Sequence, residues 1–275
     1  MTEQAPHSTS SATKARPSRG VAIAIGIVAG ALSGLFGVGG GILIVPALVM
    51  FGHMEQRLAH GTSLVAAAPL GLAGTIGYAL GRSVDWAVVG LLLAGSAAGA
   101  VVGTRLLRRL AHRTLRLGFA ALLILTAARL LIDIPEAAGR APLQPGMAAV
   151  LIVIGLATGI LAGLMGVGGG IIMVPAQNIF FDVPGAIARG TSLAVIVPTA
   201  IVGSIQNIRH HNADIATGVS VGLAGMVTSF LLSQVAIGMD ENLSAVLFAA
   251  FLLVSAARLV MTNRRHGPST ASSGG

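Results

Sequence analysis

Residues 34–47 read GLFGVGGGILIVPA, and residues 163–176 read GLMGVGGGIIMVPA. The two stretches agree at 11 of 14 positions and lie 129 residues apart. The same offset pairs HGTSL at 60–64 with RGTSL at 189–193 and continues without a gap to AARL at 127–130 and 256–259. One supersecondary unit therefore occurs twice, and the duplication spans nearly the whole chain.

The composition is that of a membrane protein. Hydrophobic residues make up 54% of the chain, charged residues only 9%, and the mean hydropathy is +0.87, beyond what a soluble domain tolerates. The 38 glycines suit the close helix packing of membrane bundles. The net charge of +8 comes from basic residues in short loops, which favours a role in membrane orientation over nucleic-acid binding. The absence of cysteine excludes disulfides and thiolate chemistry.

Apolar segments divide the chain into two matching halves. They fall at about 21–51, 61–80, 84–107 and 115–132, and again at about 147–181, 190–208, 215–238 and 243–262. We expect a disordered cytoplasmic tail over 1–20, a first transmembrane repeat over 21–133, a linker over 134–146, a second repeat over 147–262 and a disordered tail over 263–275. A signal peptide is the competing interpretation of the basic N-terminus. The duplication argues against it, because the matching segment near residue 150 cannot be a cleaved leader.

The first segment of each repeat is too long for a single helix across the bilayer. Thirty-one residues would span roughly 46 Å at about 1.5 Å per residue, whereas the hydrocarbon core is about 30 Å thick. Each of these segments carries a Gly-x-Gly-Gly-Gly run near its middle. A glycine costs about 1 kcal/mol relative to alanine inside a helix, so we expect the helix to break there.

Loop charges predict that the broken segment turns back. Five arginines lie between 105 and 116, and Arg264 and Arg265 follow the last segment, so these loops and both termini should be cytoplasmic. The charges agree if each broken segment enters and returns as a hairpin, or crosses an even number of times. Each repeat then makes an odd number of net crossings, which turns the second copy upside down. The predicted fold is a polytopic helical bundle of two inverted-topology repeats, each with a Gly-broken helical hairpin plus three full spans.

The two glycine breaks are the predicted site. Non-helical backbone at membrane depth is tolerated only inside protein or along a watery cavity. A half-helix should start near Gly41 and another near Gly170, and such N-termini present amide donors and a positive dipole end to an anion. The alternative is that the glycines only allow helices to touch. We favour the anion site, because a packing face needs small residues at a spacing of four.

Hydroxyl groups near the breaks are further candidates. Thr62, Ser63, Thr191 and Ser192 could donate to a bound oxyanion, and helix N-capping explains them equally well. Thr75 and Ser204 could line the pathway, although a bond to the preceding helical turn is the simpler interpretation. Gln206 and Asn207 have no polar counterparts in the first repeat.

Acidic residues are informative by their positions. All nine lie in tails or at segment ends, which disfavours a cation pump and a carboxylate-based proton antiporter. His60 is the candidate for proton linkage, with an interfacial role as the simpler alternative. His210 and His211 have no third metal ligand beside them, so no metal and no cofactor are expected. An intramembrane enzyme is disfavoured, since no acid, cysteine or histidine cluster lies within the spans.

The paired motifs, each followed by Gly-Thr-Ser-Leu, resemble the TauE/SafE family of membrane permeases, the sulfite exporter family, over roughly residues 21–262. The resemblance implies transport of sulfite, sulfoacetate or another sulfur-containing or organic anion across the bacterial cytoplasmic membrane. Family members are usually assigned one span where the loop charges favour a hairpin. The glycine-rich segments of the family correspond here to Gly37, Gly39, Gly40, Gly41, Gly166, Gly168, Gly169 and Gly170.

The expected function is therefore transport of a small anion by alternating access, with protons as a candidate coupling ion. An anion channel of the same architecture and a carrier for another organic anion remain open, as does a structural or sensory subunit. The expected partners are the anionic substrate and the lipid bilayer, and the oligomeric state stays open.

Overall fold

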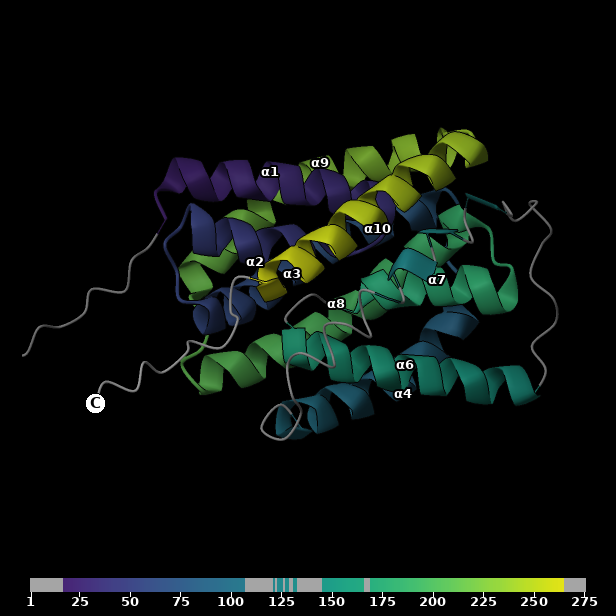
Figure 1. Ribbon diagram of the computed structural model, residues 1–275, viewed down its shortest axis with the longest axis horizontal. Coiled ribbons are helices and arrows are strands. Elements are labelled where there is room, and N and C mark those ends of the chain that lie inside the picture. The colour runs from purple at the N-terminus through teal and green to yellow at the C-terminus, as the bar shows by residue number, and fades with distance from the viewer. Residues whose placement is uncertain are drawn as a thin grey trace, which may run out of the picture.

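The computed structural model describes residues 17–106, parts of 121–132, 145–165 and 169–264. This part of the chain is helical and contains no strand. The helices are α1 (Arg19–Phe36), α2 (Gly41–Met50), α3 (Gln56–Leu80), α4 (Trp86–Leu106), α6 (Pro145–Met165), α7 (Gly170–Phe181), α8 (Gly185–Arg209), α9 (Ile215–Gly238) and α10 (Glu241–Arg264). Figure 1 shows most of them running along the long axis of the molecule.

The duplication predicts the helix boundaries well. Shifting α3 by 129 residues reproduces the bounds of α8, and the same shift places α2 on α7. Five of the described helices are long and apolar enough to cross a membrane, as expected for a polytopic membrane protein. The segment expected at 115–132 lies largely outside the described residues.

The helix ends can be compared with the expected boundaries of the tails and the linker. Residues 1–16 and 265–275 lie outside the described part, as does most of the linker expected over 134–146. Helix α1 already begins at Arg19 and α10 continues to Arg264. The first and last helices therefore each extend two residues beyond the apolar segments expected at 21–51 and 243–262.

Each long segment is divided as predicted. Helix α1 ends at Phe36 and α2 starts at Gly41 after a short break. Helix α6 ends at Met165, and α7 starts at Gly170. The chain then turns back: a methyl group added at Gly52, after α2, would lie 3.3 Å from Cβ of Pro17, before α1. The first long segment is therefore a hairpin of one full helix and one short helix.

The two repeats exchange helices. Helix α1 packs along α9 of the other repeat, α6 packs in the same way along α4, and the equivalent helices α3 and α8 contact each other between these pairs. Two hydrogen bonds follow the same reciprocity: the Asp214 N–H donates to Thr62 Oγ1 at 2.9 Å, and the Asp85 N–H donates to Thr191 Oγ1 at 3.0 Å. The core is therefore shared, because each repeat supplies the partner of the other's first helix.

Glycines allow the exchanged helices to touch backbone to backbone. A methyl group at Gly30 of α1 would overlap the Gly225 carbonyl oxygen of α9, and one at Gly159 of α6 would overlap the Ser96 carbonyl oxygen of α4. Here the packing interpretation of small residues holds, as expected for helices associating in lipid.

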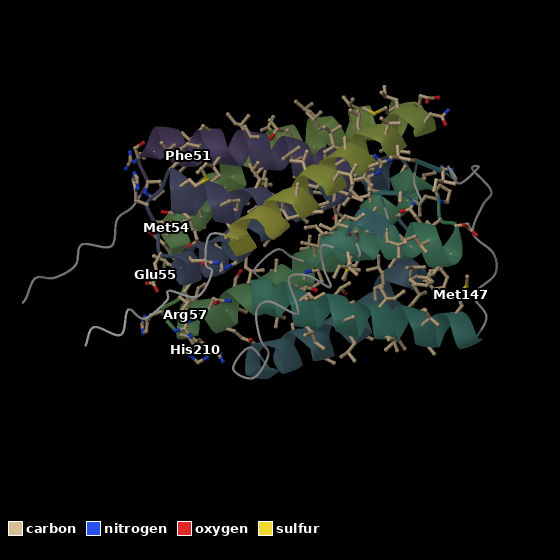
Figure 2. The ribbon with its side chains drawn as sticks, viewed as in Figure 1. Phe51, Met54, Glu55, Arg57, Met147 and His210 are labelled. Atoms are coloured by element: carbon tan, nitrogen blue, oxygen red, sulfur yellow. The ribbon has the colours of Figure 1, made fainter. Side chains whose placement is uncertain are left out.

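Equivalent elements lie at opposite ends of the molecule. Figure 2 places Phe51 and Glu55, between α2 and α3, at one end of the molecule, where the contact of Gly52 with Pro17 also puts the start of α1. Met147, at the start of the equivalent helix α6, lies at the other end. His210, which caps the end of α8, lies at the same end as Arg57 near the start of α3. Helices α3 and α8, which contact each other, therefore run in opposite directions.

Replacing Gly30 by Leu should destabilise the fold, because the added side chain must push α1 away from α9. Overpacking a tight contact costs about 3 kcal/mol, and Gly159→Leu at the equivalent contact should cost about the same. The measurement is thermal unfolding of the detergent-solubilised protein. The matched control is Gly90→Leu in α4, where nothing lies within 4 Å of an added methyl group. An equally large loss in the control would contradict the packing argument.

Candidate functional site

The first break depends on glycine at three positions. Gly37, Gly39 and Gly40 have φ of 70°, 74° and 73°, a left-handed conformation that costs other residues about 1–2 kcal/mol. Gly37 caps α1 by donating its N–H to the Ser33 carbonyl at 2.8 Å. Gly40 precedes the first residue of α2. The expected helix break is confirmed, and backbone strain explains why glycines occupy it.

The second break repeats this geometry where it is described. Gly169 has φ of 77° and precedes α7, as Gly40 precedes α2. A methyl group at Gly169 would lie 3.1 Å from the carbonyl oxygen of Thr158, and one at Gly40 would lie 3.2 Å from that of the equivalent Ala29. Gly166 and Gly168 lie outside the described residues.

The two breaks meet inside the protein. A methyl group at Gly170 would lie 2.7 Å from the Gly37 carbonyl oxygen and 2.9 Å from Val38 Cα. Residues 37–41 and 169–170 are buried. The prediction that the breaks approach each other is therefore confirmed for this pair of contacts.

At the start of each short helix, amide donors have no acceptor among the described residues. Both N-cap residues are glycines, Gly40 and Gly169, so neither helix has a side-chain cap. The Gly40 carbonyl accepts from the amides of Leu43 and Ile44, and Gly169 accepts in the same way from the amides three and four residues on. Within the described residues the two preceding amides of each helix, at 41–42 and 170–171, have no acceptor. Buried amides ordinarily find a partner, and these four lie at the positive ends of helix dipoles.

The four predicted hydroxyl residues are fully buried, and one of them, Ser192, contacts the first break. Thr62 and Thr191 accept the inter-repeat hydrogen bonds described above. Ser192 Oγ donates to the Gly37 carbonyl at 3.0 Å, and Ser63 Oγ donates to the His60 carbonyl at 2.8 Å. Thr62 and Thr191 thus connect the two repeats, and Ser192 connects α8 to the first break.

The N-capping explanation does not hold for these residues. Helix α3 has Glu55 at its N-cap and α8 has Pro184, so both hydroxyl pairs lie inside the helices, more than one turn from the start. The simpler interpretation of Thr75 holds, since its hydroxyl donates to the Gly71 carbonyl at 2.7 Å. Its counterpart Ser204 has a buried Oγ without a partner among the described residues.

A buried cation beside the first break escaped the sequence analysis. Arg189 of α8 is only 5% exposed, and a methyl group at Gly37 would lie 2.6 Å from its Cα. Its Nε donates to the Gly185 carbonyl at 2.8 Å, and its Nη1 reaches the Leu35 carbonyl, near the end of α1, at 3.0 Å. Within the described residues it forms no ion pair. The sequence signal that could have identified it is that Arg189 and His60 occupy equivalent positions of the two repeats, directly before Gly-Thr-Ser-Leu.

Three acidic side chains in the described part cap helix starts. Asp214 accepts from the amides of Ala216 and Thr217 at the start of α9, while Asp85 and Asp240 accept equivalent bonds at the starts of α4 and α10. No carboxylate of the described residues lies in the middle of a span. Carboxylates at helix starts are stabilised by the dipole, so their positions follow from folding.

Comparison with known proteins agrees with this architecture. The family described as Sulfite exporter TauE/SafE matches residues 2–130 and 151–274, one range over most of each expected repeat. A probable membrane transporter protein of Bacillus subtilis, YunE, is 28% identical over 211 residues, covering 68% of this chain and 77% of its own. A probable membrane transporter protein of Xylella fastidiosa is 43% identical over 86 residues, covering 31% of this chain and 33% of its own.

A third relative aligns with this chain over nearly the whole of its own length. The probable membrane transporter protein YjnA of Bacillus subtilis is 25% identical over 250 residues, which is 86% of this chain and 98% of that protein. A family match across both repeats, combined with a polytopic helical fold, leads to one conclusion. The chain belongs to the TauE/SafE family and is a multi-pass membrane transporter, not an enzyme.

Proposed function

We propose that this transporter carries a small oxyanion, with sulfite or a related sulfur-containing anion as the expected substrate. The observation that carries the proposal is the pair of buried helix N-termini at the contacting breaks, whose amides have no acceptor among the described residues. An anion would satisfy these donors and the positive dipole ends. The description of the matched family as a sulfite exporter supports the sulfur-containing class.

The proposed site surrounds the contact between the two breaks. Its backbone is that of Gly37, Gly39, Gly40, Gly41, Gly166, Gly168, Gly169 and Gly170. We include Thr62, Ser63, Thr191 and Ser192 in the proposed site; the hydrogen bond from Ser192 to the Gly37 carbonyl supports this at the first break. A hydroxyl that accepts one bond still has a proton to donate, so Thr62 and Thr191 keep the capacity to contact the anion.

Arg189 supplies positive charge at the same place. A buried charge without a counter-ion is costly, and a bound anion next to the first break would offset this cost. A guanidinium also matches the several oxygens of an oxyanion better than an ammonium group does. The charge of the site therefore favours anions over cations.

Alternating access would use the relation between the two repeats. The opposite positions of equivalent elements and the antiparallel run of α3 and α8 support inverted repeats, in which one repeat moves relative to the other around a fixed site. Figure 1 also shows α10 ending at the end of the molecule where α1 begins. This supports both termini on one side of the bacterial cytoplasmic membrane, and the basic residues there favour the cytoplasmic side.

Transport is tested with purified protein in liposomes. Saturable sulfite flux is expected, with inhibition by sulfoacetate or thiosulfate, stimulation by anion on the opposite side, and a response to an imposed pH gradient if protons are coupled. Non-saturating flux without counter-stimulation would indicate a channel. Absence of flux for every anion tested, from folded protein, would overturn the proposal.

Gly40→Leu and Gly169→Leu should each abolish flux while leaving membrane insertion intact. Both positions have φ above 70°, so a leucine must distort the break and displace the free amides at a cost of about 1–2 kcal/mol. The measurement is flux per inserted protein. Gly238→Leu is the control, because open space surrounds that glycine. Normal flux in both variants would contradict a site at the breaks.

Arg189→Gln should raise the half-saturation concentration for sulfite about tenfold, equivalent to about 1.4 kcal/mol. Glutamine keeps a donor for the Leu35 carbonyl but removes the positive charge. Arg209→Gln, at the exposed end of the same helix, serves as the control and should change the constant by less than twofold. An unchanged constant in Arg189→Gln would limit this residue to holding α1 against α8.

A further inference from the structure

Ser33 of α1 carries a hydroxyl without a visible role. The residue is 0% exposed, and its Oγ has no hydrogen-bond partner in the described structure. Several hydroxyls inside these helices donate to a carbonyl of the preceding turn, as Thr199 does to Val195 at 2.8 Å and Ser255 does to Phe251 at 2.7 Å. A buried polar group left unpaired costs free energy. A ligand that accepts a hydrogen bond from Ser33 Oγ would remove this cost.

The helical register directs Ser33 to the start of α2. Gly40 lies against Ala29, and Ser33 follows Ala29 by four residues, which places it on the same face of α1 one turn closer to the break. The second repeat shows the same arrangement: a methyl group at Gly169 would lie 3.5 Å from Cβ of Ala162, the residue equivalent to Ser33. By this register Ser33 lies on the face of α1 that meets the start of α2, where the amides of Gly41 and Ile42 are located.

The two breaks differ in their donors. Ser33 at the first break corresponds to Ala162 at the second, and Arg189, which contacts the first break, corresponds to His60. The hydroxyl of Ser33 and the guanidinium of Arg189 thus both lie near the first break. At the second half-helix the position equivalent to Ser33 has no polar group.

We infer that the first break is the primary oxyanion subsite, in which Ser33 Oγ and the amides of Gly41 and Ile42 donate hydrogen bonds to the anion. Arg189 supplies charge beside this subsite. The inference rests on the proposed function and deepens it, because it names one of the two half-helix starts and a side chain that contacts substrate. A hydrogen bond to a charged group is stronger than one between neutral groups, so the hydroxyl should matter for affinity.

The test compares Ser33→Ala, which copies the second repeat, with Ala162→Ser, which copies the first. Ser33→Ala should raise the half-saturation concentration for sulfite flux about tenfold and weaken thermal stabilisation by sulfite to the same extent. Without sulfite its unfolding temperature should equal or exceed that of the unchanged protein, since no hydrogen bond is lost. Ala162→Ser should leave the half-saturation concentration within twofold.

The outcomes separate this inference from the proposed function. If the unchanged protein transports sulfite and Ser33→Ala has the same half-saturation concentration, the inference is wrong and the proposed function stands. A lower unfolding temperature of Ser33→Ala without sulfite would also overturn it, because the hydroxyl would then have a structural partner. If the unchanged protein neither transports nor is stabilised by any anion, the proposed function fails and the inference fails with it.

Discussion

The constraint behind this architecture is that backbone polar groups have no water to bind inside a bilayer. An intact helix meets the constraint by itself, and a broken helix does not. The chain breaks twice, at Gly37–Gly40 and just before Gly170, and it buries both breaks against each other. The remaining helices can be understood as the enclosure that keeps lipid away from these segments.

Exchange of helices between the repeats builds this enclosure. Helices α3 and α8 cross in the middle and carry the hydroxyl residues, and the outer pairs of α1 with α9 and α6 with α4 clamp them from both sides. Because each clamp joins the two repeats, a movement of one repeat must act on both breaks. An architecture with two self-contained halves would lack this mechanical connection.

Much of the fold was predictable because the chain records it twice. The two breaks and the starts of α2 and α7 follow from span length and glycine propensity, which are local properties. Helices α3 and α8 begin at Gln56 and Gly185, five residues before the starts expected at 61 and 190. Arg189 and Ser33 were harder, since a residue's burial and hydrogen-bond partners depend on helices far away in sequence. For Arg189 the sequence offered one signal, because a polar residue, His60, occupies the equivalent position of the first repeat. Nothing in the sequence marked Ser33, because the hydroxyl of a serine in an apolar helix ordinarily donates to a carbonyl of the preceding turn.

The exchange of helices also affects how the protein is made. Helix α1 ends at Phe36, whereas its partner α9 begins at Ile215, so roughly 180 residues must still be synthesised before the two can meet. At about 5–20 residues per second, α1 waits on the order of ten to forty seconds. During that interval its glycine face meets lipid or the insertion machinery. Biogenesis of this transporter therefore includes a late assembly step that must wait until α9 has been translated.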